Sequence, residues 1–203
     1  MLKFKEYITE DKEGYLTIFD IDDTLFHTTA QIIIRKSGKA IKKLTSAEFN
    51  HYKLGRGESA DFSEFSDANK FNRESRPIPK MMNKAKALLA DTNKHPNNKI
   101  IIVTARPNLD DRDKFLDTFR KHGFDIDKVR VERAGRISAS NAPQSKAIII
   151  YNYLKTGHFN KVRLFDDSIN NLREFLKLER HFPDRKSTRL NSSHGYISYA
   201  VFC

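Results

Sequence analysis

Three aspartates follow the first apolar run of the chain and are the first residues whose types and spacing could do chemistry. Residues 16–19 are apolar apart from one threonine, and Asp20, Asp22 and Asp23 come directly after them. At the carboxyl end of a strand in an open α/β sheet, these side chains would lie where such sheets bind ligands. Carboxylates so close together repel unless a cation neutralises them or one keeps its proton. The pattern predicts an oxygen-rich site for a hard divalent ion, with a plain acidic turn as the alternative.

Other polar residues follow later apolar runs in the same way. Thr104 ends the second run, Asp166 and Asp167 follow the fourth, at residues 162–165, and Lys146 begins a helical pattern between them. Hydrolysis of a phosphate monoester requires a cation to neutralise its charge, a nucleophile, hydrogen-bond donors for its oxygens and an acid to protonate the leaving oxygen. These residue types supply all four, so the set indicates phosphoryl chemistry.

The elements that must position these residues alternate along the chain, as in a parallel sheet with crossover helices. Short apolar runs predict strands at residues 16–19, 99–103, 129–131 and 162–165. Apolar residues at helical spacing predict helices at residues 79–92, 113–122, 144–155 and 169–178. We therefore expect an α/β protein with a Rossmann-like, three-layer αβα parallel sheet.

Residues 26–76 have a different pattern and predict a small cap or flap inserted after the first strand. Residues 31–44 indicate a β-hairpin, and residues 45–54 indicate a short helix that Thr45 caps. Residues 55–76 are polar and are interpreted as a loop. Three phenylalanines are available to pack this segment down or to cover a site, namely Phe62, Phe65 and Phe71.

Composition excludes several classes of protein. Lys and Arg number 37 against 26 Asp and Glu, so the net charge is +11, which favours encounters with polyanions. The single cysteine, Cys203, excludes a disulfide framework and a structural zinc site. No apolar run approaches membrane-spanning length, and the N-terminus lacks a secretory signal. We expect a cytoplasmic protein without a membrane partner, and the oligomeric state stays open.

Residues 184–203 resemble the translation of a short-read sequencing adapter, beginning at Asp184 and running through a Ser-rich stretch. We expect the natural chain to end near Pro183 and to form one domain over residues 1–183. The tail of residues 184–203 is then an artefact that is not part of the natural fold. A genuine polar terminus is the alternative. The tail carries +2 of the net charge of +11, which leaves +9 for the rest.

Over about residues 15–178 the chain resembles the haloacid dehalogenase superfamily of hydrolases. That family has an Asp-x-Asp-x-Thr motif after a strand, a Thr or Ser after a second strand, a lone lysine, and an Asp pair after another strand. The matching residues are Asp20, Asp22, Thr24, Thr104, Lys146, Asp166 and Asp167. Asp23 stands where many members carry glycine, and Lys155 and Lys161 are alternatives to Lys146. The family's helical turn and flap agree with the predicted hairpin.

The resemblance implies a two-step phosphatase reaction. Asp20 would attack phosphorus and form an aspartyl phosphate, which splits one difficult step into two easier ones. Asp22 would protonate the leaving oxygen and then deprotonate the attacking water. An Asp at this second position favours a phosphatase over the dehalogenases and ion pumps of the same family, which lack that acid.

The resemblance also implies a magnesium site and its surroundings. Mg²⁺ would be held by Asp20, the backbone carbonyl of Asp22 and Asp166, with Asp167 reached directly or through water. Thr104 and Lys146 would stabilise the phosphoryl oxygens.

A closer resemblance is to the phosphatase domain of polynucleotide kinases, in which the second motif is also followed by an arginine. Here Arg106 occupies that place, and Arg133 and Arg136 lie in a loop before the lysine helix. This resemblance implies that the three arginines bind substrate and that the substrate is a 3′-phosphorylated nucleic acid end. The positive charge of the predicted flap would suit such a partner.

Alternatives remain for the function. The chain contains no Gly-x-x-x-x-Gly-Lys-Ser/Thr loop and therefore no partner kinase site. Within the enzyme class, a general small-molecule or nucleotide phosphatase is the alternative. Outside it, the protein could be a nucleic-acid-binding accessory, or an interaction module in which the acidic cluster merely binds Mg²⁺.

Overall fold

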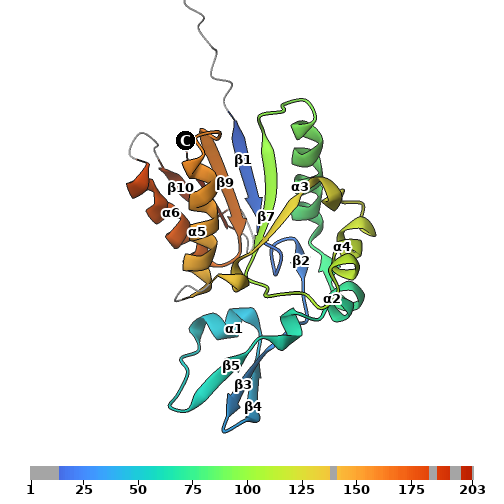
Figure 1. Cartoon of the computed structure of the whole chain (residues 1–203), viewed down its shortest axis with the longest axis vertical. Coiled ribbons are helices and arrows are strands. Elements are labelled where there is room, and N and C mark those ends of the chain that lie inside the picture. Colours follow the sequence, from blue (N-terminus) through green and yellow to red (C-terminus); the bar gives the residue numbers. More distant parts are fainter. Residues whose placement is uncertain (1–13, 138–140, 183–186, 193–197, 203) are drawn as a thin grey trace, which may run out of the picture.

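A central sheet of six strands, in the order β10-β11-β9-β1-β7-β8, organises the computed structural model (Figure 1). The structure describes residues 14–137, 141–182, 187–192 and 198–202. The expectations about the N-terminal signal, the boundary at Pro183 and Cys203 lie outside these residues. The strands of the sheet are β1 (Tyr15–Phe19), β7 (Lys99–Thr104), β8 (Arg130–Arg133), β9 (Lys161–Asp166), β10 (Ser187–Ser192) and β11 (Ser198–Phe202).

Four neighbouring strands, β9, β1, β7 and β8, run parallel, so their carboxyl ends meet at one edge. Helices cover both faces (Figure 1): α3 (Pro79–Thr92) and α4 (Arg112–Arg120) lie on one, α5 (Ala142–Lys155) and α6 (Ile169–Lys177) on the other. This confirms the predicted α/β class with a mostly parallel sheet between helices, and it is compatible with a Rossmann-like fold. Within the described residues, no helix has the length and apolar character needed to cross a membrane.

Each face of the sheet has its own apolar core, because successive strand residues point to opposite faces. In β7, Ile100 and Ile102 pack toward α3 and α4, while Ile101 and Val103 pack toward α5 and α6. All four side chains are buried. A strand buried on both faces reads as a continuous apolar run, which is why β7 was recognisable from sequence.

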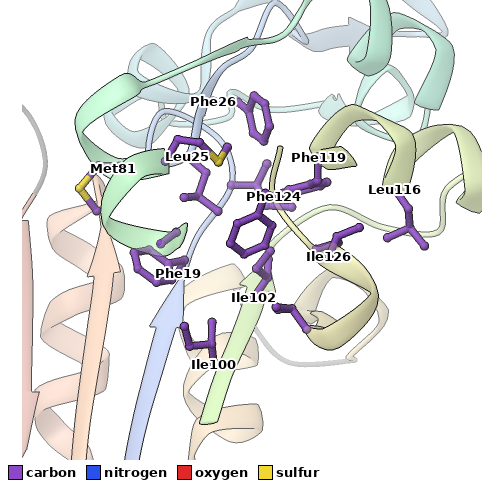
Figure 2. Packing of buried hydrophobic residues seen from close by; sticks show 14 of the residues in the cluster. Phe19, Leu25, Phe26, Met81, Ile100, Ile102, Leu116, Phe119, Phe124 and Ile126 are labelled. Carbon is purple, nitrogen blue, oxygen red and sulfur yellow. The ribbon is translucent and has the colours of Figure 1, made fainter. Parts of the chain in front are cut away.

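The first of these cores also fixes the loop that follows β1. Figure 2 shows Phe26 beside Phe119 of α4, with Phe124 and Ile102 beneath them. The rings of Phe26 and Phe119 meet edge to face with centroids 5.1 Å apart. β2 (Phe26–His27) also pairs with β6 (Arg76–Pro77). The loop between β1 and β2 is therefore fixed by the central sheet at one end and by this pairing at the other.

The inserted segment contains a small sheet of its own, in the order β4-β3-β5. Its strands are β3 (Ile32–Lys36), β4 (Lys39–Leu44) and β5 (Glu58–Asp61), and α1 (Ser46–His51) follows β4. Ser37 and Gly38 both have positive φ angles, as a two-residue hairpin turn requires. The predicted capping box of Thr45 and Glu48 is present. In Figure 1 this small sheet lies beyond the carboxyl ends of the parallel strands.

The interpretation of residues 55–76 as a loop is wrong in large part. The segment contains β5, a short 3₁₀ helix η1 (Ser63–Phe65), α2 (Ala68–Glu74) and β6. Phe65 is buried in the core of the small sheet and Phe71 in the main core, so two of the three phenylalanines anchor the chain. Asp67 caps α2 by accepting a hydrogen bond from the backbone N–H of Lys70. The polar residues that surround Phe65 and Phe71 along the chain gave no indication of this anchoring role.

Other predicted elements differ from the observed ones at their ends. Strand β8 and helix α4 each begin at a neighbouring residue, and further 3₁₀ helices occur at η2 (Ile126–Lys128), η3 (Ala134–Arg136) and η4 (Leu178–His181). Two strands that the sequence analysis left out of the fold extend the sheet: β11 pairs antiparallel with β9, and β10 pairs antiparallel with β11. Tyr199 of β11 packs near Phe165, with ring centroids 5.6 Å apart. That these strands are an artefact stays a prediction.

Candidate active site

Three carboxylates meet at the carboxyl edge of the parallel strands. Asp20 follows β1 and Asp166 ends β9, and these strands are paired in register, with the N–H of Asp20 donating to the carbonyl of Phe165 at 3.0 Å. Asp20, Asp166 and Asp167 each offer a carboxylate oxygen, and these oxygens lie within 4.8 Å of one another. Strand pairing therefore brings together residues that are almost 150 positions apart in sequence.

Lys146 is the cation of this cluster. Its Nζ lies 2.8 Å from Oδ1 of Asp20 and 2.9 Å from Oδ2 of Asp166, and all three side chains are almost fully buried. Helix α5 presents Lys146 from its first turns, after Asn141 caps the helix by accepting from the N–H of Gln144. The alternative Lys155 is exposed near the far end of the same helix.

The electrostatics of the cluster show an excess of negative charge. Burial raises the pKa of Asp20 well above its ordinary value; Lys146 opposes that shift, and Asp166 and Asp167 add to it. Burial, followed by the charge of Asp166, raises the pKa of Asp167 to about 7. For Lys146, burial alone would lower the pKa, but Asp166 and Asp20 raise it above the ordinary value of lysine. One ammonium thus does not balance the three carboxylates, and a proton or a metal cation must supply the rest.

Hard carboxylate oxygens in this arrangement fit a divalent cation such as Mg²⁺. Asp166 is held in place by the backbone N–H of Ser168 at 2.9 Å and by the side-chain amide of Asn171 at 2.8 and 3.0 Å. The N–H of Asp167 donates to Oγ1 of Thr24 at 3.1 Å. Sequence reasoning missed Asn171, whose only signal was a donor in the first turn of the helix after the Asp pair.

Asp22 is tied to a buried arginine and stands outside the three converging carboxylates. Nε and Nη2 of Arg106 donate to its two carboxylate oxygens at 3.0 and 2.7 Å, and the hydroxyl of Thr28 donates at 2.8 Å. Nη1 of Arg106 donates to the backbone carbonyl of Phe65 at 3.0 Å. The guanidinium also lies 4.4 Å from the ring centroid of Phe71. Arg106 therefore orients Asp22 and joins it to η1.

This geometry gives Arg106 a positioning role, and the contact with substrate that the sequence predicted stays a prediction. Thr104 is buried at the end of β7, and its Oγ1 accepts a hydrogen bond from the N–H of Arg106 at 3.1 Å. Arg133 is half-buried and Arg136 exposed. Burial, then the neighbouring charges of Arg136 and Arg112, lower the pKa of Arg133.

A pocket of about 920 Å³ joins the carboxylate cluster to the small sheet. At the sheet edge it is lined by Asp20, Asp22, Arg106, Lys146 and Asp167. On the opposite side, the lining comes from Ile32, Phe49, Phe62 and Phe65, and α6 adds Asn170, Arg173 and Lys177. Arg133 and Arg136 are not among its lining residues, although Ala134 and Gly135 between them are.

The site thus combines three converging carboxylates that could hold a metal ion, a further carboxylate in a fixed orientation and a buried ammonium, beside a pocket large enough for an organic molecule. Comparison with known proteins adds no relative to these observations, because no family model, no curated protein and no solved structure matches the chain.

Proposed function

We propose that the protein is a Mg²⁺-dependent phosphatase of the haloacid dehalogenase type, which hydrolyses phosphate monoesters through an aspartyl phosphate. One observation carries the proposal: three aspartates from two neighbouring strand ends converge within 4.8 Å, and Lys146 bridges two of them. Burying so many carboxylates has a high desolvation cost, which a purely structural role would not explain. The pocket beside it supplies space for a substrate.

In the first step, a carboxylate oxygen of Asp20 attacks phosphorus, and the bond from phosphorus to the leaving oxygen breaks. Asp22, in its protonated form, gives its proton to that oxygen, so the alcohol leaves neutral. In the second step, Asp22 takes a proton from water, whose oxygen attacks phosphorus and releases Asp20 and inorganic phosphate. The contacts of Asp22 with Arg106 and Thr28 would hold it in one orientation for both transfers.

Asp20, Asp166 and Asp167, with the backbone carbonyl of Asp22, would hold the Mg²⁺ ion. When bound, the ion would neutralise charge on the phosphoryl group and on the carboxylates. Lys146 opposes the rise in the pKa of Asp20 that burial causes, and it orients this carboxylate, since its ammonium lies 2.8 Å from Oδ1 of Asp20. Thr104 would contribute its hydroxyl to the phosphoryl oxygens.

For the substrate, a 3′-phosphorylated nucleic acid end is the first candidate. The small sheet, of which Ile32 lines the pocket, exposes three lysines of β4, namely Lys39, Lys42 and Lys43. Binding of such lysines to nucleic acid phosphates releases counterions, so the affinity falls steeply as the salt concentration rises. A general small-molecule or nucleotide phosphatase is the second candidate, supported by the size of the pocket.

The test is phosphate release by the full chain with Mg²⁺ and then with EDTA. The substrates are a 3′-phosphorylated oligonucleotide and a panel of small phosphate esters. We expect Mg²⁺-dependent release that Asp20→Asn reduces about 10³-fold or more. Asp113→Asn, at a carboxylate exposed on α4, is the matched control and should retain the wild-type rate. Full activity of Asp20→Asn would refute the mechanism and leave the non-catalytic alternatives.

A further inference from the structure

The wall of the pocket opposite the carboxylate cluster carries an aromatic ring that the proposed chemistry does not use. Phe62 is 43% exposed, whereas Phe65, three residues later, is 7% exposed. Both line the pocket, together with Phe49 of α1. Burying a phenylalanine ring is favourable, so a ring left open in a pocket is available to a ligand.

The structure around Phe62 holds this ring in place. Its ring centroid lies 5.4 Å from that of Phe49, with an interplanar angle of 89°, so Phe49 supports it edge to face. Phe62 stands between the end of β5 and the start of η1. That junction is braced by Asp61, whose carboxylate accepts hydrogen bonds from the N–H of Ser63 at 2.9 Å and from Nε of Arg35 at 2.8 Å. The ring is thus presented with little conformational freedom to lose on binding.

The part of the pocket wall that α6 forms is polar, whereas Pro107, Ile137 and Pro143 add further apolar surface elsewhere. Helix α6 contributes Asn170, Arg173 and Lys177 to the wall. Asn170 and Arg173 are exposed on this wall, whereas Lys177 forms an ion pair with Glu174, which also lines the pocket. A purely hydrocarbon group bound against Phe62 would offer no hydrogen bonds to Asn170 and Arg173. A flat ring with hydrogen-bonding atoms at its edge satisfies both walls, since its face stacks on Phe62 and its edge meets polar side chains.

We propose that Phe62 determines substrate specificity by stacking on a nucleobase-like heterocycle of the leaving group. This inference rests on the proposed function for the reaction, but it names a different residue and a different part of the substrate. The phosphate would lie at the carboxylate cluster and the ring at the small sheet, on opposite sides of one pocket. The small sheet would therefore select the leaving group.

Calorimetric binding tests the inference apart from catalysis. The Asp20→Asn chain with Mg²⁺ is titrated with a nucleoside monophosphate, with ribose monophosphate, which has no ring base, and with phenyl phosphate, whose ring has no polar edge. We expect the nucleotide to bind about tenfold or more tightly than either of the others, as one stacked base implies. Equal affinity for the nucleotide and ribose phosphate would overturn the proposal, and equal affinity for the nucleotide and phenyl phosphate would overturn the assignment to a heterocycle.

Three variants in the same background locate the effect. Phe62→Leu should lose about tenfold in nucleotide affinity and leave the affinity for ribose phosphate within about twofold. Phe62→Tyr keeps the ring and should retain discrimination, which also controls for misfolding. Tyr15→Leu, at an exposed aromatic residue of β1 outside this pocket, should change neither affinity. Equal losses for both ligands in Phe62→Leu would refute the role. Absence of phosphate release from every substrate by the wild-type chain would instead refute the proposed function, and the binding result would still decide the role of Phe62.

Discussion

The buried ion pair between Arg106 and Asp22 allows a quantitative test of how the site is held together. The side chains are 1% and 14% exposed, and two hydrogen bonds join the guanidinium to the carboxylate. In Arg106→Gln the carboxylate of Asp22 stays largely buried but loses its cation, and the carbonyl of Phe65 loses a donor. The variant therefore removes the connection between the end of β7, the loop after β1 and η1.

Removing one partner of a buried ion pair costs about 3–5 kcal/mol. Because Asp22 keeps some exposure and also accepts a hydrogen bond from Thr28, we expect a value near the lower end, about 3 kcal/mol. Asp22→Asn removes the negative charge that the loss of Arg106 would otherwise leave unpaired. The double variant should therefore be more stable than the sum of the two single effects implies, with a coupling energy of about 2 kcal/mol.

The assay is urea unfolding of the wild type, both single variants and the double variant at pH 7. Arg120→Gln is the matched control, because Arg120 also makes two hydrogen bonds to one carboxylate, that of Asp127, but on the surface. Its loss should cost less than about 1 kcal/mol. The reasoning fails if Arg106→Gln costs no more than Arg120→Gln, or if the effects of Arg106→Gln and Asp22→Asn are additive.

Two further predictions concern the elements that frame the pocket. The pKa of Asp61 is lowered to about 2, first because the backbone N–H of Ser63 donates to it and then because of its other donors, including Arg35. Its stabilising contribution is therefore complete above the unfolded pKa near 4 and is lost as the pH falls through the folded pKa of about 2. Asp61→Asn should lower stability at pH 7 by about 1 kcal/mol after allowance for solvent screening. Urea unfolding should find this difference between variant and wild type much smaller near pH 2. In Gly135→Ala the added Cβ would lie 2.5 Å from the backbone carbonyl oxygen of Ala105, so η3 must move away from β7 at a cost of about 1–3 kcal/mol; a melting temperature equal to that of the wild type would contradict this.

Local patterns in the sequence were sufficient for the main elements of the fold. The predicted helix at residues 79–92 has the same bounds as α3, and the capping box of Thr45 and Glu48 forms as predicted. Helix periodicity, capping and continuous β-branched runs depend on residues within a few positions of one another. Strand ends followed by carboxylates then placed Asp20 and Asp166 at one edge, because parallel strands align their carboxyl ends.

Only the tertiary structure decided which of the remaining polar residues act together. Nothing in the sequence predicted that the guanidinium of Arg106 bonds to Asp22, 84 positions away, and the contact of Arg106 with substrate stays a prediction. Residues 55–76 were interpreted as a loop, yet Phe65 and Phe71 anchor them in two cores. The exposure of Phe62 in the pocket depends on where the small sheet lies against the main one. Ion pairs, burial and pocket walls join residues that are distant along the chain, so their energies depend on packing that no local pattern records.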